Sequence, residues 1–440
     1  MKTFRSWDVD QGWLLPPSIH DFVPAGHLAH FVRGLVREEL DLSAILDEYD
    51  EERGMPPYHP GMMTALILYG YCQGVYSSRR IAKGCEERVD FMAVTGQQKP
   101  DFRTVNRFRL RHLDALGELF VQVLKLCQHA KLAKLGHVAI DGTKIRANAS
   151  KNKAMSYERM SETEKRLREQ VKGWFEQAQA IDEAEDEEHG VDRRGDELPD
   201  WVANKEKRRQ KIAEAKAALE AEAKEEAKRR AQGEPNKSRT APTQDGKPHP
   251  KRQRNFTDPE SRIMNTQEGF QQCYNAQSAV DAASQVIVAC DLGTNATDMA
   301  HLIPLVDQIA KNTGRAPVEI SADAGYCSEA NLEKLEGRQI RAFVGIGRQR
   351  HGESSPVAGR SKPEPGTRRY AMWLRLQRGG FKSRYRLRKQ TVEPVYGQIK
   401  AGRGFRQFLL RGVQKVSSEW RLICTAHNLR KLAGALGASW

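Results

Sequence analysis

The chain has 440 residues, enough for about two to four domains of ordinary size. Its 71 Lys and Arg outnumber its 57 Asp and Glu, and the net charge of +14 favours a polyanionic partner, nucleic acid first, over a basic surface that binds nothing. No apolar run reaches membrane-spanning length and the seven cysteines form no C-x-x-C pair, so we expect a cytoplasmic, nucleoid-associated protein with reduced thiols and no membrane partner.

Residues 1–133 are predicted to form a helical N-terminal domain. Segment 60–76 is apolar throughout and indicates a buried helix, and Ser77 or Ser78 is a good cap for the next one. Asp101 is predicted to cap a further helix. On that helix arginines recur every four residues, opposite an apolar face, at positions Arg103, Arg107 and Arg111, facing away from Val105 and Phe108.

These last two helical segments could form a helix-turn-helix unit whose arginines contact DNA. An ordinary amphipathic helix with solvated arginines fits the same pattern, and the spacing does not separate the two interpretations.

Residues 134–154 and 256–440 are predicted to form an α/β domain with a mixed sheet and flanking helices. Segment 136–147 indicates a strand, a turn and a second strand, and small residues at 282–284 indicate a hairpin. Further strands and helices alternate up to the C-terminal helices, with a basic, Gly/Pro-rich loop predicted at 348–380.

An insertion separates the two parts of this domain. Residues 155–231 are dense in Glu, Lys, Arg and Ala and are predicted to form an antiparallel helical hairpin with solvated charges. Its first helix has a heptad seam at Leu167, Val171, Trp174, Ala178 and Ile181, and its second has an apolar stripe at Ile212, Ala215, Leu219 and Ala223. Residues 232–255 are predicted to be a basic, flexible linker.

Three acidic residues stand at chemically suggestive positions. Asp141 and Asp323 each end an apolar strand, and neighbouring strands would bring the two carboxylates to one edge of the sheet. Glu393 lies early in a later helix, with Thr391 as the expected N-cap and Lys400 two turns further along the same face.

Three carboxylates so arranged could hold two Mg²⁺ (or Mn²⁺) ions about 3.5–4 Å apart and activate a water or a 3′-hydroxyl for in-line attack on phosphate. Arg388 and Lys400 are the cations expected nearby. Singly, each acid could equally cap a turn or face a helix dipole. Four further aspartates compete for the role: Asp258, Asp281, Asp291 and Asp298.

Several stretches resemble the bacterial insertion-sequence transposases of the DDE type, which have an RNase H-like catalytic fold. They are "AIDGTKIRANAS", "YNAQSAVD", "SADAGYCSEANL" and "YRLRKQTVEPVYGQIKAGRGFRQFLLRG". The stretches "GMMTALILYGYCQGVYSSRRIAKGCEERVDFMAVTG" and "PDFRTVNRFR" resemble the helical domain that precedes the catalytic one in this family.

The resemblance implies that Asp141, Asp323 and Glu393 are the catalytic and metal-binding acids. The family's Tyr-Arg-Glu-Lys signature then maps to Tyr385, Arg388, Glu393 and Lys400 as DNA-contacting and catalytic positions. The gap between Arg388 and Glu393 is one residue longer than in related groups, and Lys389 would restore it.

The activity implied is that of a DNA transposase. Such an enzyme binds the terminal inverted repeats of its own element, cleaves double-stranded DNA at the element ends and joins the 3′-hydroxyls to target DNA. It is expected to act as a homodimer or a higher oligomer on DNA.

Other functions remain open at this stage. A metal-dependent nuclease with the same fold would cleave without strand transfer, and a domesticated DNA-binding protein would have lost one of the three acids. A phosphatase suggested by "IDGTK" needs an aspartate where Ala139 stands. No P-loop or G-x-G-x-x-G motif implies a nucleotide cofactor.

Overall fold

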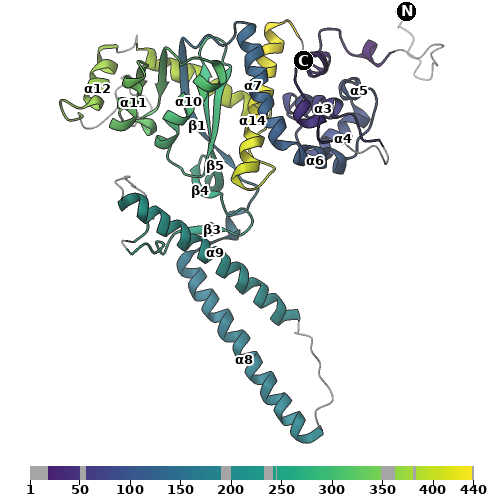
Figure 1. The fold of residues 1–440 in the computed structure, drawn as a ribbon, viewed down its shortest axis with the longest axis vertical. Coiled ribbons are helices and arrows are strands. Elements are labelled where there is room, and N and C mark those ends of the chain that lie inside the picture. Colours follow the sequence, from purple (N-terminus) through teal and green to yellow (C-terminus); the bar gives the residue numbers. More distant parts are fainter. Residues whose placement is uncertain are drawn as a thin grey trace, which may run out of the picture.

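The computed structural model describes residues 18–49, 56–189, 200–231, 241–243, 245–347, 362–379 and 383–438. A sheet flanked by helices lies beside a bundle of N-terminal helices, and a long helical hairpin projects from below the sheet (Figure 1). None of the described helices is long and apolar enough to cross a membrane. All seven cysteines are buried and free, as the sequence predicts.

The N-terminal part is helical, as predicted. Its elements are η1 (Ile19–Phe22), α1 (Leu28–Glu38), α2 (Ser43–Leu46), α3 (Pro60–Cys72), α4 (Ser78–Glu87), α5 (Val89–Thr95), α6 (Phe102–Arg111) and α7 (Leu113–His129). The expected buried helix is α3, and Asp101 caps α6 by accepting from the N–H groups of Arg103 and Thr104. The segment after Ser77 forms two helices instead of one, because Arg88 takes an extended conformation between α4 and α5.

The sheet has the strand order β4-β5-β1-β7-β8, with β6 paired to the second half of β5. The strands are β1 (His137–Arg146), β4 (Arg262–Thr266), β5 (Gly269–Asp281), β6 (Ile287–Gly293), β7 (Glu319–Ala322) and β8 (Arg341–Val344). Strands β1, β7 and β8 are mutually parallel, whereas β5 runs antiparallel to β1. The sheet is therefore mixed, and the predicted hairpin at 282–284 joins β5 to β6.

One prediction for this sheet is wrong. Residues 136–147 do not form a strand, a turn and a second strand, because β1 continues unbroken through Gly142 and Thr143. Both residues pair with β5, Gly142 opposite Gln277 and Thr143 opposite Ala276. The Gly-Thr pair therefore has a role other than turning the chain.

Helices cover both faces of the sheet and its far edge (Figure 1). They are α10 (Leu302–Thr313), α11 (Glu329–Gly337), α12 (Arg368–Gly379), α13 (Leu387–Gly397) and α14 (Val413–Ala435). Helix α12 lies within the predicted 348–380 loop, so that prediction is wrong for 368–379. Its Met372 and Leu376 are buried, and the helix packs on α11 and β8, contacts with distant segments that the local sequence does not reveal.

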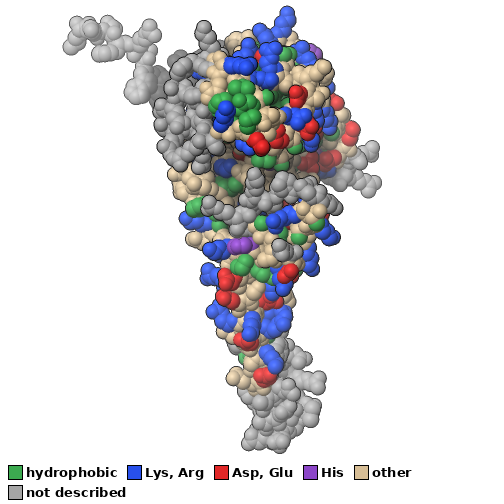
Figure 2. Space-filling model, turned by 90° about the vertical axis from the view of Figure 1, so that its left-hand side faces the viewer, with side chains coloured by type: hydrophobic (Ala, Val, Ile, Leu, Met, Phe, Trp, Pro, Cys, Tyr) green, Lys and Arg blue, Asp and Glu red, His purple; other side chains and the backbone are tan. Residues whose placement is uncertain are grey.

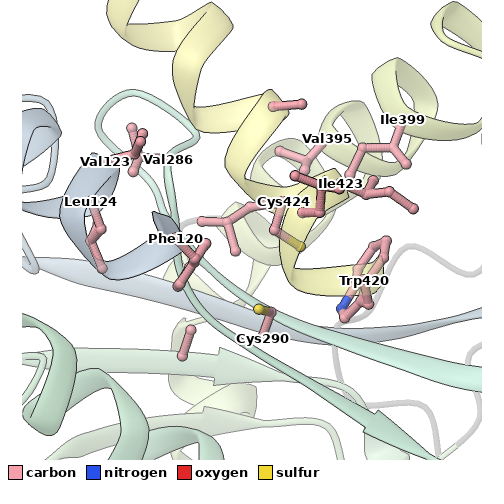
Figure 3. Close-up of a cluster of buried hydrophobic side chains, with 14 of the residues drawn as sticks. Phe120, Val123, Leu124, Val286, Cys290, Val395, Ile399, Trp420, Ile423 and Cys424 are labelled. Atoms are coloured by element: carbon pink, nitrogen blue, oxygen red, sulfur yellow. The ribbon is translucent and has the colours of Figure 1, made fainter. Parts of the chain in front are cut away.

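Helix α14 is the centre of the core. Figure 3 shows Trp420 and Cys424 of α14 among Phe120 of α7, Cys290 of β6 and Val395 of α13. The same helix packs against α3 and α1 of the N-terminal part, so both parts share one continuous apolar cluster. The separation of residues 1–133 from the catalytic domain remains a prediction.

Polar contacts fix α14 as firmly as its packing does. The side chain of Asn428 accepts from the backbone N–H of Ile287 at 2.9 Å and donates to its carbonyl at 2.8 Å, in the manner of a neighbouring strand. Trp420 Nε1 donates to the carbonyl of Gln277 at 3.0 Å, and Arg430 donates to the carbonyl of Cys72 at 2.9 Å. Buried groups paired in this way avoid a cost of about 1–3 kcal/mol each.

The insertion is the predicted helical hairpin, formed by α8 (Tyr157–His189) and α9 (Asp200–Ala231). Leu167 packs against Ile212 and Leu219 in a small separate core, and Lys216 pairs with Glu164 at 3.0 Å. The side chains of Ala178 and Ile181 lie outside the described residues. Charges of both signs are interspersed over the projecting part (Figure 2), as expected for solvated faces.

The predicted linker is described at 241–243 and 245–255, and its second half differs from a flexible chain. Strand β3 (Gln253–Asn255) pairs with β2 (Ala154–Ser156). Arg252 pairs with Glu226 at 2.5 Å, and Arg254 pairs with Glu222 at the same distance. These two arginines of the predicted linker are thus engaged by acidic residues of α9.

We predict that acid destabilises the fold through His427 of α14. Its Nε2 donates to the carbonyl of Gln285 at 2.8 Å and its Nδ1 faces the guanidinium of Arg403 at 3.2 Å, and burial followed by Arg403 lowers its pKa to about 3. Between pH 6.5 and 3 the unfolded chain therefore binds a proton that the folded chain does not. As the pH falls through this window, the free energy of unfolding should decrease by about 1.4 kcal/mol per pH unit because of this group.

Denaturant unfolding of the wild type and of His427→Gln at pH 7, 6, 5 and 4 measures this effect. The glutamine variant should lose stability less steeply than the wild type below pH 6.5. Parallel slopes for the two proteins would contradict the assignment.

Candidate active site and basic groove

Asp141 and Asp323 lie side by side because of the register of two strands. Strands β1 and β7 are parallel neighbours, and their last matched pair is Ile140 opposite Ala322. Asp141 and Asp323 are the next residues on each strand and therefore stand level, as the sequence predicted for strands that neighbour one another. Asp141 lies within β1, whereas Asp323 follows β7 and accepts from the N–H of Gly325 at 2.8 Å.

Helix α13 crosses above this pair and is tied to β1. Tyr396 donates its hydroxyl hydrogen to the carbonyl of Asp141, and Val392 and Val395 are buried beneath the helix. Arg388 forms an ion pair with the carboxylate of Asp141, and the two side chains are only 11% and 17% exposed. The arginine is thus the cation nearest the first acid.

Glu393 is the third predicted acid, and its position differs from the prediction. Helix α13 begins at Leu387, so Thr391 is not an N-cap and Pro394 lies inside the helix. The Glu393 side chain is exposed and close enough to help raise the pKa of Arg388. It forms no closed set with the two aspartates, and no group of three or more His, Cys, Asp or Glu in the described chain is gathered tightly enough to hold a metal ion.

The electrostatics of the pair are those of buried carboxylates. Burial raises the pKa of Asp141 to about 7, despite the opposing effect of Arg388, and Asp323 raises it further. Burial also raises the pKa of Asp323, again against Arg388. Burial lowers the pKa of Arg388, but the negative charge of Asp141 and of the other nearby acidic groups raises it by more. The pKa of Arg388 is therefore raised overall. Near neutral pH a cation would therefore stabilise the ionised forms of both aspartates.

Of the other signature residues, Tyr385 lies beside Arg388, whereas Lys400 contacts β1 two and three residues beyond Asp141. The Tyr385 ring centroid lies 6.0 Å from the Arg388 guanidinium carbon. Lys400 lies in a π-helical turn, η7 (Gln398–Gly402), and its Nζ donates to Thr143 Oγ1 at 3.0 Å and to the carbonyl of Lys144 at 2.9 Å. Lys389 is exposed, so the structure places Arg388 at Asp141 in spite of the longer gap.

Three of the four competing aspartates have structural partners elsewhere. Asp258 accepts from the Tyr274 hydroxyl at 2.8 Å, Asp281 from the N–H of Leu135 at 2.6 Å, and Asp291 faces His301 at 2.7 Å. Asp298 is different, because its charge raises the pKa of both Asp141 and Asp323. It is a fourth carboxylate beside the pair that sequence order alone did not distinguish.

The donors at this place suit a hard divalent cation. The described side chains at this place include the carboxylates of Asp141, Asp323 and Asp298 and the amide oxygen of Asn275, donors of the kind that such a cation prefers. Asn275 Oδ1 is buried without a hydrogen-bond partner in the described chain, and a Cβ on Gly142 would lie 3.0 Å from it. An unpaired buried oxygen beside ionisable carboxylates fits a site that takes a cation.

A basic groove of about 830 Å³ lies along α6. Its lining includes Arg79 of α4, Arg103 and Arg107 of α6, and Leu409 of the segment before α14. Arg103 and Arg107 are exposed, on the face opposite buried Val105 and Phe108.

Arg111 differs from the other two predicted arginines. It pairs with the Glu48 carboxylate at 2.9 Å and donates to its carbonyl at 2.6 Å. On the arginine face of α6, Arg103 and Arg107 therefore line the groove, whereas Arg111 holds α6 to the segment after α2.

The fold and this site define the class. A mixed sheet with flanking helices, next to a helical N-terminal part, is the architecture of an RNase H-like DDE domain, and a family match supports the same class. Residues 238–429 match the family model "Transposase DDE domain", and residues 17–111 match "Transposase domain (DUF772)". The chain belongs with the DDE-type insertion-sequence transposases, enzymes that act on DNA in transposition.

The matched segments cover Asp323 and Glu393, whereas Asp141 lies between them. No curated protein and no solved structure matches the chain.

Proposed function

We propose that this transposase binds the terminal inverted repeats of its own insertion sequence, cleaves the DNA at the element ends and transfers the 3′-hydroxyl ends to target DNA. Asp141, Asp323 and Glu393 are the proposed catalytic acids. The active form is proposed to be a homodimer or a higher oligomer on nucleoid DNA, since two ends must be cut together.

One observation carries the proposal. The register of β1 and β7 places Asp141 level with Asp323, and α13 brings Arg388 directly to Asp141. The family matches supply the general activity, DNA transposition, and this geometry supports the residues that perform it.

Asp141 and Asp323, with Glu393 from α13, would hold the divalent cations, Mg²⁺ or Mn²⁺, which supply charge neutralisation and an activated nucleophile when bound. In cleavage, a water oxygen attacks the phosphorus and the bond to the departing strand breaks, which leaves a 3′-hydroxyl. In transfer, that hydroxyl attacks the phosphorus of a target phosphodiester and loses its proton, while the bond to the target strand's own 3′ oxygen breaks and that oxygen leaves as a new 3′-hydroxyl.

The residues around the acids position the DNA. Arg388, which neutralises Asp141 in this structure, offers its guanidinium to a phosphate of bound DNA. Lys400, held against Thr143 and the carbonyl of Lys144, keeps the π-helical turn on β1 and offers a positive charge to DNA further along that strand.

We predict that Asp141→Asn, Asp323→Asn and Glu393→Gln each lower end cleavage by about 10³-fold or more, because each removes a carboxylate that would hold a cation, and the cation's charge stabilises the transition state by several kcal/mol. DNA binding should survive. Cleavage of labelled DNA containing the repeats that flank the gene, with binding measured in parallel, tests this prediction.

Asp291→Asn is the matched control, because Asp291 is bonded to His301 away from the pair. It should cleave like the wild type. Full cleavage by any of the three variants would remove that residue from the catalytic set. Cleavage without end joining by the wild type would favour a metal-dependent nuclease.

The raised pKa of Asp141 predicts a pH dependence of cation binding. A cation must displace the proton that Asp141 holds below about pH 7. The apparent affinity for Mn²⁺ should therefore fall as the pH drops from 7 to 6, by about tenfold per unit, and change less between pH 7 and 8. Calorimetric titration at pH 6, 7 and 8 measures it, and an affinity independent of pH would contradict a cation site at Asp141.

The basic groove predicts a DNA-binding effect. The double variant Arg103→Ala with Arg107→Ala should weaken binding to the element end and reduce the slope of log K against log salt by about 2, because two phosphate contacts are lost. The control pair is Arg166→Ala with Arg168→Ala, exposed arginines of α8. Equal losses for both pairs would exclude a special role for α6.

A further inference from the structure

Asp298 lies in the turn before the 3-10 helix η3 (Met299–His301), and its side chain is held by β5. Its Oδ1 accepts from Asn275 Nδ2 and from Gln277 Nε2, both at 2.7 Å. Asp298 stands at the N-cap position of η3, yet its side chain makes no capping bond. Helix capping therefore does not explain the aspartate, and its Oδ2 accepts no hydrogen bond from the part of the chain described.

Two glycines make room for this carboxylate. A Cβ on Gly142, the residue after Asp141, would lie 2.8 Å from Asp298 Oδ1 and 2.3 Å from Gln277 Nε2. A Cβ on Gly325, two residues after Asp323, would lie 3.1 Å from Asp298 Oδ2. Neither glycine has a positive φ, so space and not backbone conformation requires them.

The carboxylate of Asp298 thus bridges the two acidic positions. One oxygen faces the backbone after Asp141 and the other faces the backbone near Asp323. Gln277 and Asn275 fix the first oxygen and leave the second available. The buried Asn275 Oδ1, without a partner in the described chain, lies beside the same glycine. An unpartnered oxygen such as Asn275 Oδ1 is costly in a protein interior and is favourable beside a cation, and the half-buried Asp298 Oδ2 adds a second oxygen that accepts no hydrogen bond from the described chain.

The charge distribution supports the same role. The negative charge of Asp298 contributes to the raised pKa of Asp141, of Asp323 and of the buried Tyr326 hydroxyl. Arg388 is the cation paired with Asp141. The Lys144 ammonium also acts on Asp323, so three carboxylates face two cationic side chains and leave an excess of negative charge that a divalent cation would neutralise.

We propose that Asp298 is a fourth acidic ligand residue of the active site. In the described chain the three carboxylates are not gathered tightly enough to hold a metal ion, and a divalent cation would draw Asp298 Oδ2 together with Asp141 and Asp323 when it binds. This inference rests on the proposed function of the pair. It differs from the assignment of Glu393, which reaches the site from α13, because Asp298 is held within the sheet layer before DNA or metal arrives.

The test is Mn²⁺ binding to the full-length protein without DNA, measured by calorimetry or by the electron paramagnetic resonance signal of free Mn²⁺. Asp298→Asn keeps the shape and its bonds to Asn275 and Gln277, and it should lower the affinity by about 10–100-fold. Asp291→Asn, the control on the neighbouring strand, should bind like the wild type.

The outcomes separate this inference from the proposed function. If the wild type binds Mn²⁺, Asp141→Asn loses it and Asp298→Asn binds normally, the role of Asp298 is overturned and the catalytic pair stands. If the wild type binds no Mn²⁺ and does not cleave, the proposed function itself fails.

A second pair of variants keeps the test open if Asp298→Asn does not fold. Gly325→Ala retains every carboxylate and places its Cβ 3.0 Å from Asp323 Oδ1 as well as 3.1 Å from Asp298 Oδ2, whereas Gly337→Ala places its Cβ where nothing lies within 4 Å. The first should weaken Mn²⁺ binding relative to the second. Equal affinities for Gly325→Ala and Gly337→Ala would refute a ligand role for this oxygen.

Discussion

The burial of α14 is the interaction on which the rest of the structure depends. One helix packs on β6 and α7 and also on α3, so the sheet and the N-terminal helices have a single core. Asn428 and Trp420 add hydrogen bonds to the backbone of β6 and β5, which fixes the helix in rotation as well as in position. Because α13 precedes α14 and lies on β1, the same core also holds Arg388 over Asp141. The same core therefore fixes the position of the basic groove on α6 relative to the acidic site.

The packing of the sheet also builds the acidic site, where it brings several carboxylates close together. Register places Asp141 beside Asp323, and the glycines after them admit Asp298 between the two backbones. Burial penalises these charges, as the raised pKa of both aspartates shows, and the nearby Arg388 offsets only part of the penalty. A centre of this kind is arranged for positive charge from outside, which is what chemistry on a phosphodiester backbone requires.

Much of this arrangement follows from local patterns, and the errors share a cause. Asp101 caps α6, and the stripe through Ile212 and Leu219 is buried in the hairpin, because caps and helical periodicity act over a few residues. Gly142 suggested a turn, although it serves close packing across the sheet. Residues 368–379 looked like a basic loop, although Leu376 is buried between elements distant in sequence. In each case the deciding partner lies far away along the chain.

By itself the sequence determined the helical character of the N-terminal part, the mixed sheet and the inserted hairpin, since each depends on periodicity and spacing. It also determined that Asp141 and Asp323 end up as neighbours if their strands pair. Only the tertiary structure decided that those strands do pair, in parallel and in register, that Arg388 occupies the position at Asp141, and that Arg111 is engaged by Glu48. Only the tertiary structure also distinguished Asp298 from the other three competing aspartates, because it places Asp298 beside Asp141 and Asp323. The reason is physical: hydrogen-bond partners and free space are properties of surroundings that several distant segments build together.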